Sequence, residues 1–130
     1  MGKKRILLVE DNKDNFELVR YLLESAGYEV LAAEDGIQGL EVARQETPDM
    51  ILMDLSLPEM DGWTAASQLK ADPKTAAIPL YAITAHTLPG DRRRALDTGF
   101  DGYIPKPIDF KNFASTIHAV FAQRAKASEG

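Results

Sequence analysis

Five short apolar runs, separated by amphipathic stretches of helical length, are the feature that most constrains the fold of this 130-residue chain. The runs are 6–9, 30–33, 50–53, 80–83 and 103–104, and the first, third and fourth are apolar throughout. Continuous apolarity is typical of strands covered by helices on both faces. Alternation of such strands with helices predicts repeated βα units. We therefore expect an α/β fold, with a five-stranded parallel sheet and helices on both faces.

The stretches between the runs carry apolar residues at three- and four-residue spacing, which predicts helices. The first extends from Phe16 to Ala26, and Gly27 is a suitable residue to cap its C-terminus. Others are expected around 37–43, 63–70 and 92–98, and a fifth helix carries Phe110, Phe113, Ile117, Val120 and Phe121. The sequence shows no linker and no internal repeat. It predicts one domain over 1–130, with a core at 5–122 and a frayed helical tail at 124–130.

Composition and charge exclude several classes of function. The absence of cysteine excludes thiol catalysis and cysteine-ligated zinc or iron–sulfur sites, and it fits a reducing compartment. The net charge of -5 argues against nucleic-acid binding, which depends on clustered lysine and arginine. The first apolar run ends at Val9 and is too short for a signal peptide or a membrane span. We expect a cytoplasmic protein without membrane insertion.

Polar residues follow four of the predicted strands. Glu10 and Asp11 come after the first strand, Asp54 after the third, Thr84 after the fourth and Lys106 shortly after the fifth. Ligands of open parallel sheets bind outside the carboxyl ends of the strands. These side chains are therefore expected to converge at one edge of the sheet.

Three carboxylates that lie together raise one another's pKa unless a cation intervenes. Oxygen ligands without cysteine or paired histidine favour a hard ion, Mg²⁺ or Mn²⁺. A lysine and a hydroxyl at the same edge suit phosphoryl transfer, in which Asp54 is the candidate nucleophile and would become an aspartyl phosphate. Taken singly, an aspartate after a strand more often caps a helix or a turn. The joint placement at strand ends favours the chemical interpretation.

Four segments carry a resemblance to a known family. They are LVEDN at 8–12, ILMDLSLPEMDG at 51–62, ITA at 83–85 and GYIPKP at 102–107. With these motifs the chain resembles, over residues 5 to about 122, the receiver domain of two-component response regulators, including single-domain regulators of chemotaxis and the cell cycle. The resemblance implies a flavodoxin-like fold with strand order 2-1-3-4-5.

The resemblance also implies roles for individual residues. Asp54 would accept a phosphoryl group from the phosphohistidine of a sensor histidine kinase or a histidine phosphotransfer protein. The implied Mg²⁺ ligands are Glu10, Asp11, Asp54 and the backbone carbonyl of Ser56. Lys106 would hold a phosphoryl oxygen, with a cis bond to Pro107. Thr84 and Tyr103 would form the switch: the Thr84 hydroxyl moves toward the phosphoryl group and Tyr103 fills the vacated space.

The switch would change the face formed by the fourth helix, the last strand and the fifth helix. Because the sequence ends after the fifth helix, we expect a single-domain receiver that is not an enzyme, although it assists its own phosphotransfer and dephosphorylation. Its output would be contact with a downstream protein target, through surfaces such as 58–63 and 106–110. His86 is a candidate for orienting the attacking water, beside the simpler reading of a loop residue. The sequence leaves the oligomeric state open.

Three other functions compete with this one. A pseudo-receiver would bind partners without phosphorylation, but the complete set of site residues argues against it. A flavodoxin would bind FMN through a Ser/Thr/Gly-rich loop after the first strand, whereas this chain has the acidic segment EDNKD at 10–14. A metal-dependent phosphohydrolase would need longer loops to cover a small substrate. Nucleotide-binding and hydrolase motifs are absent from the sequence.

Overall fold

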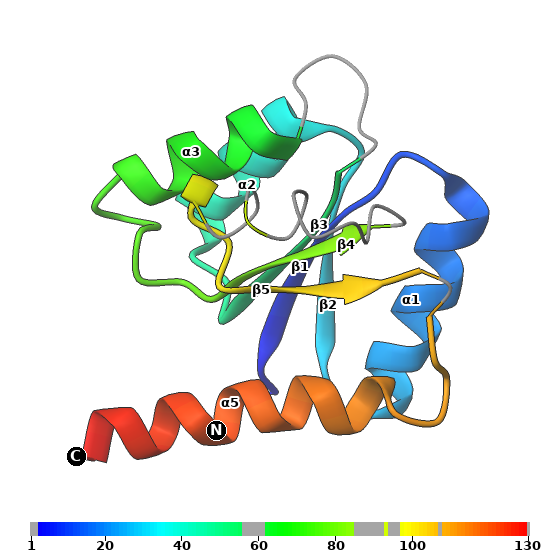
Figure 1. Ribbon diagram of the computed structural model, residues 1–130. Coiled ribbons are helices and arrows are strands. Elements are labelled where there is room, and N and C mark those ends of the chain that lie inside the picture. The colour runs from blue at the N-terminus through cyan, green and yellow to red at the C-terminus, as the bar shows by residue number, and fades with distance from the viewer. Residues whose placement is uncertain (1–2, 56–61, 85–92, 94–96, 107, 130) are drawn as a thin grey trace.

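The computed structural model describes residues 3–55, 62–84, 93, 97–106 and 108–129 (Figure 1). Five parallel strands form one sheet in the order β2-β1-β3-β4-β5. The strands are β1 (Arg5–Val9), β2 (Glu29–Ala33), β3 (Met50–Asp54), β4 (Leu80–Thr84) and β5 (Gly102–Pro105). The predicted fold class and strand order are confirmed.

Helices cover both faces of this sheet, so the molecule has three layers (Figure 1). The helices are α1 (Lys13–Ser25), α2 (Gly36–Glu46), α3 (Gly62–Ala71) and α5 (Phe113–Glu129). Successive side chains of a strand point to opposite faces. Leu7 and Val9 therefore pack in the cluster under α2 and α3, while Ile6 and Leu8 pack under α1 and α5. This two-sided burial explains why β1 is apolar at every position from 6 to 9.

Local signals fix both ends of α1. The Asn12 side chain accepts a hydrogen bond from the Asn15 amide at 2.9 Å, which satisfies one of the free N–H groups at the start of the helix. At the other end Ala26 is the cap residue and Gly27 follows with φ +98°, a left-handed conformation that glycine adopts without steric cost. The predicted end of this helix at Gly27 is confirmed.

The prediction for the fifth helix was wrong at its start. Helix α5 begins at Phe113, so Phe110 lies outside it and is 60% exposed. The cause lies in Asp109, whose carboxylate accepts hydrogen bonds from the Lys111 amide at 3.1 Å and from the Asn112 side chain at 2.6 Å. These local bonds hold a turn that delays the helix. At its other end α5 continues to Glu129, through the tail predicted to be a frayed helix end.

Several predictions fall on residues that the structure does not describe. They concern Ser56, the surface at 58–61, His86 and Pro107. Of the helix expected at 92–98, Arg93, Asp97 and Thr98 are described and are helical, with Arg93 and Asp97 in an ion pair at 3.4 Å. Among the described residues no helix is both long and apolar enough to cross a membrane.

Candidate functional site

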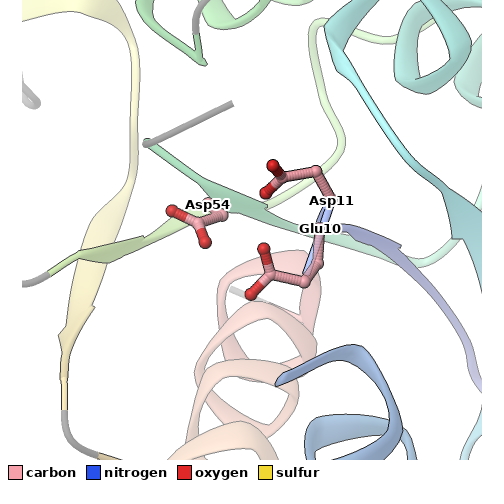
Figure 2. A group of neighbouring side chains, drawn as sticks. All are labelled: Glu10, Asp11 and Asp54. Atoms are coloured by element: carbon pink, nitrogen blue, oxygen red, sulfur yellow. The ribbon is translucent and has the colours of Figure 1, made fainter. Parts of the chain in front are cut away.

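Three carboxylates meet at the carboxyl edge of the sheet (Figure 2). Val9 pairs with Met53, so Glu10, the first residue after β1, lies beside Asp54, the last residue of β3. One oxygen from each of Glu10, Asp11 and Asp54 lies within 4.8 Å of the others. Glu10 is 6% exposed and Asp54 is 2% exposed, whereas Asp11 faces solvent. The predicted convergence of these side chains is thus observed.

Lys106 brings a positive charge to this acidic cluster. Its Nζ donates a hydrogen bond to Oδ2 of Asp54 at 2.8 Å, and the side chain of Asp54 in this ion pair is almost fully buried. The backbone amide of Lys106 also donates to the carbonyl of Thr84 at 2.9 Å. The end of β4 therefore fixes the backbone of Lys106, and the side chain extends past it to Asp54 at the end of β3.

Glu10 shows the electrostatic cost of gathering these acids. Its pKa is raised from 4.5 to about 8, first because burial removes water from the carboxylate. The hydrogen bond with Asp54 and the negative charge of Asp54 raise the pKa further. The amide of Asn12, which donates to Glu10 Oε2 at 3.4 Å, and the charge of Lys106 act in the opposite direction and compensate only in part. At neutral pH Glu10 therefore holds a proton in the metal-free protein.

The donor set fits a hard divalent cation. The cluster offers carboxylate oxygens from two neighbouring strand ends, and the raised pKa of Glu10 shows an excess of negative charge that one divalent ion would relieve. Mg²⁺ binds to oxygen ligands and uses one or two carboxylates together with water. The residues present are suitable for such an ion.

A family model for the response regulator receiver domain matches residues 6–118, most of the chain and all of the site. The chain belongs to this family. It is a receiver domain of the two-component systems, whose members act with histidine kinases or phosphotransfer proteins.

Curated relatives and solved structures agree with this assignment. The chain is 41% identical over 114 residues to the polar-differentiation response regulator DivK of Brucella anthropi and to that of Brucella ovis. Each match covers 88% of this chain and 93% of the relative. The receiver domain of a sensor histidine kinase from Pseudomonas aeruginosa, solved with a magnesium ion in its active-site cleft, is 36% identical with a TM-score of 0.84, over 91% of this chain and 97% of that one. The chemotaxis response regulator CheY4 of Vibrio cholerae gives a TM-score of 0.86 at 26% identity, over 92% of this chain and 99% of that one.

The two residues expected to form the switch of this receiver lie on the side of β4 and β5. Thr84 ends β4 and is buried, one residue beyond Ile83, which pairs with Asp54 across the strands. Tyr103 pairs with Ala82, farther from the carboxyl edge, and its half-buried ring packs against the cluster under α2 and α3. Thr84 therefore adjoins the acidic cluster, whereas Tyr103 is not part of it.

Sequence reasoning gave no role to Asn12, which the receiver uses twice. Its side chain caps α1, and its backbone amide donates to the buried Glu10 carboxyl. The sequence signal for the cap was present, because asparagine before a helical stretch favours this position. The hydrogen bond to Glu10 could not be foreseen, since it depends on how the chain turns after β1.

Proposed function

We propose that Asp54 is the phosphoacceptor of this response regulator and receives its phosphoryl group from the phosphohistidine of a sensor histidine kinase or a histidine phosphotransfer protein. The observation that carries the proposal is the buried Asp54 at the end of β3, with Lys106 at 2.8 Å and with Glu10 and Asp11 in the same cluster. A strand end of the central sheet holds this carboxylate in one place, as an in-line attack requires.

In the proposed step an oxygen of Asp54 attacks phosphorus. The bond between phosphorus and the imidazole nitrogen breaks, and the imidazole leaves with the electron pair and takes up a proton from solvent. Lys106 keeps its proton and donates hydrogen bonds to the oxygens that gain negative charge. The same residues could later assist hydrolysis of the aspartyl phosphate, so we regard the protein as a phosphoacceptor that assists its own phosphotransfer and dephosphorylation, rather than as an enzyme.

We assign the divalent cation to Glu10, Asp11 and Asp54, with the backbone carbonyl of Ser56 as a further proposed ligand. The cation would be Mg²⁺, with Mn²⁺ as a substitute, and it would neutralise charge on the transferring phosphoryl oxygens. The magnesium ion in the cleft of the Pseudomonas aeruginosa receiver, a relative at 36% identity, supports this choice. Glu10 would have to lose its proton before it could bind the ion as a carboxylate.

The consequence of phosphorylation would pass through Thr84 and Tyr103. The Thr84 hydroxyl would donate to a phosphoryl oxygen on Asp54, and the ring of Tyr103 would repack on the side of β4 and β5. We propose that a downstream protein target recognises this changed surface, that residues 1–130 act as one receiver domain, and that the protein works in the cytoplasm without binding nucleic acid.

The test is the intact mass of the purified protein after incubation with Mg²⁺ and acetyl phosphate. A single phosphoryl adduct is expected, and it should be absent in Asp54→Asn and in the presence of a chelator. An adduct that persists in Asp54→Asn would refute the assignment of the acceptor. If wild type forms no adduct from acetyl phosphate or from a panel of phosphorylated histidine kinases, the protein is a pseudo-receiver instead.

A further inference from the structure

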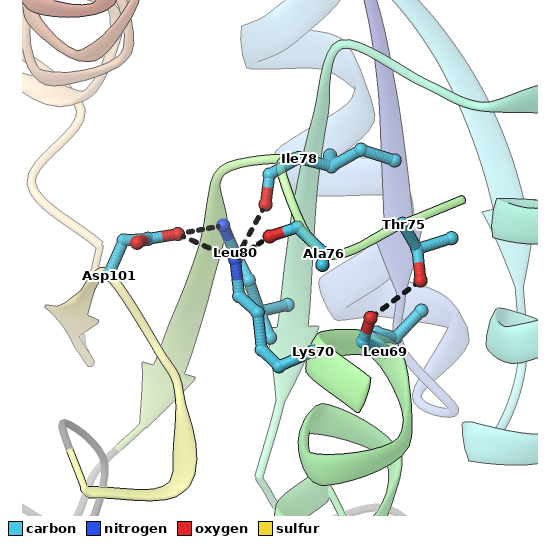
Figure 3. Close-up of polar contacts among 7 residues, drawn as sticks. All are labelled: Leu69, Lys70, Thr75, Ala76, Ile78, Leu80 and Asp101. Carbon is cyan, nitrogen blue, oxygen red and sulfur yellow. Dashed lines mark hydrogen bonds and ion pairs between the residues drawn. The ribbon is translucent and has the colours of Figure 1, made fainter. Parts of the chain in front are cut away.

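A second ionic cluster lies at the opposite edge of the sheet from the acidic site, around the lysine near the end of α3 (Figure 3). The Nζ of Lys70 lies 3.0 Å from the carbonyl of Ala76, 2.9 Å from the carbonyl of Ile78 and 3.3 Å from Oδ2 of Asp101. An ammonium group has three N–H donors, so each has an acceptor here. Lys70 thereby joins α3, the segment that leads into β4 and the residue that precedes β5.

Asp101 in turn is hydrogen-bonded to both the amide and the carbonyl of Leu80, the first residue of β4. The Leu80 amide donates to the Asp101 carboxylate at 2.7 Å (Figure 3). The Asp101 amide donates to the Leu80 carbonyl, also at 2.7 Å. The ladder of β4 and β5 starts directly afterwards, where Tyr81 pairs with Gly102. The carboxylate of Asp101 thus fixes where β5 begins to pair.

Strand β5 has few other anchors. It is an edge strand of four residues with β4 as its single neighbour. Gly102 contributes no side chain, and Pro105 has no N–H to give to the ladder. Ile104 is its buried residue, and beyond the strand the Lys106 amide bonds to the Thr84 carbonyl. Asp101 and Lys106 therefore stand at the two ends of a short edge strand, and each is hydrogen-bonded to β4.

We propose that Asp101, held by Lys70, is a positioning residue for Lys106. A shift of β5 by one residue along β4 would move the lysine by about 3.3 Å. Such a shift would break the 2.8 Å contact between Lys106 and Asp54. The clamp at Asp101 prevents this slippage from the far end of the strand. The inference rests on the proposed role of Asp54 as phosphoacceptor, but its first readout does not.

That first readout is amide hydrogen exchange at Lys106 in Asp101→Ala. We expect exchange at this amide to become roughly tenfold faster, because the strand frays more often. Asp72→Ala is the matched control: Asp72 also pairs with a cationic side chain, Arg44 at 2.8 Å, and accepts from the Lys74 amide at 2.9 Å, but it has no bond to β5. Asp101→Asn retains an oxygen for the Leu80 amide and should lie between wild type and Asp101→Ala.

The second readout is the initial rate of adduct formation with acetyl phosphate and saturating Mg²⁺. Asp101→Ala should slow this rate roughly tenfold in the wild-type background. In a Lys106→Ala background it should slow the rate by less than about twofold, because both substitutions act through the contact between Lys106 and Asp54. The Mg²⁺ affinity should stay within about twofold of wild type, because the carboxylate ligands follow β1 and β3.

Three results would overturn the positioning role. They are unchanged exchange at Lys106 in Asp101→Ala, an equal loss of rate in both backgrounds, and an equal effect of Asp72→Ala. If wild type forms no adduct, the proposed phosphoacceptor role fails and the exchange experiment alone decides the role of Asp101.

Discussion

The raised pKa of Glu10 predicts that the metal-free protein becomes less stable as the pH rises. The folded state holds a proton on Glu10 up to about pH 8, whereas the unfolded chain loses it near 4.5. Above 4.5 the folded state binds more protons than the unfolded state, so the free energy of unfolding falls with pH. One pKa unit corresponds to about 1.4 kcal/mol. The shift from 4.5 to about 8 therefore means that full ionisation of Glu10 lowers the free energy of unfolding by on the order of 5 kcal/mol.

The useful window is pH 6 to 8, where the unfolded glutamate is already ionised. Between pH 6 and pH 8, the ionisation of Glu10 lowers the free energy of unfolding of the wild type by about 2 kcal/mol. Glu10→Gln has no such proton, so its free energy of unfolding relative to wild type should rise by about 2 kcal/mol over the same window. Groups that do not interact with Glu10 titrate alike in both proteins, so their contributions cancel in the difference.

The assay is urea unfolding at pH 6, 7 and 8 with EDTA present. Glu41→Gln, which neutralises an exposed glutamate on α2, controls for the change of net charge. With saturating Mg²⁺ the loss of wild-type stability with pH should disappear, because the ion binds the ionised carboxyl and stabilises the folded state more strongly at high pH. If the free energies of unfolding of wild type and Glu10→Gln in EDTA changed in parallel with pH, Glu10 would not be protonated in the folded state, and the reasoning would be refuted.

Three further predictions concern stability. Lys106→Ala should lower the free energy of unfolding by about 2 kcal/mol, because it removes the cation that pairs with the buried Asp54 carboxylate. In an Asp54→Asn background the loss should be less than about 1 kcal/mol, and equal losses in a double-mutant cycle by urea unfolding would contradict this. Thr47 caps α2 with φ 41°, a left-handed conformation that strains a side chain, so Thr47→Gly should stabilise the protein by about 1 kcal/mol. Gly27 has φ +98° with open space around it, so Gly27→Ala should destabilise the protein by about 1 kcal/mol through backbone strain alone. Shifts of Tm in opposite directions would check both. Ile117→Ala at a fully buried position of α5 should cost about 3 kcal/mol, and a Tm within 2 °C of wild type would argue against the packing of α5 on the sheet.

The sequence predicted those parts of the molecule that depend on local pattern. Apolar runs gave the five strands, most clearly β1, β3 and β4, because a strand buried on both faces is apolar at almost every residue. The position of Glu10, Asp11, Asp54 and Lys106 at one edge followed from parallel pairing alone. The start of α5 was missed because Asp109 holds a turn before Phe113, and an aspartate can act either in a turn or as a helix cap.

Contacts between distant segments could not be read from the sequence. Lys70 and Asp101 are 31 positions apart, and neither stands in a motif. A lysine at the end of a helix is most often a solvated charge. Two of its three acceptors exist here because the loop before β4 folds back over the end of α3, and the third, Asp101, comes from the segment before β5. The sequence predicted that the gathered acids would raise one another's pKa, but it could not show that burial would be the largest cause or that Glu10 would be the residue affected.

The two halves of the site differ in how firmly the sheet holds them. The acids follow β1 and β3, strands of five residues that are paired on both sides and almost fully buried, so the carboxylates have little freedom to move apart even though their charges repel. Tyr103 and Lys106 belong to β5 and to the residue just after it, at the edge where the sheet has its shortest strand, whereas Thr84 ends β4, which pairs with both β3 and β5. An edge strand with one neighbour opens at lower free energy than a central strand. The proposed metal ligands and the proposed acceptor thus lie on central strands, whereas Tyr103 and Lys106 lie at the edge strand, which opens more easily. The proposed clamp at Asp101 opposes this opening at the start of β5 and keeps the strand in the register that brings Lys106 to Asp54.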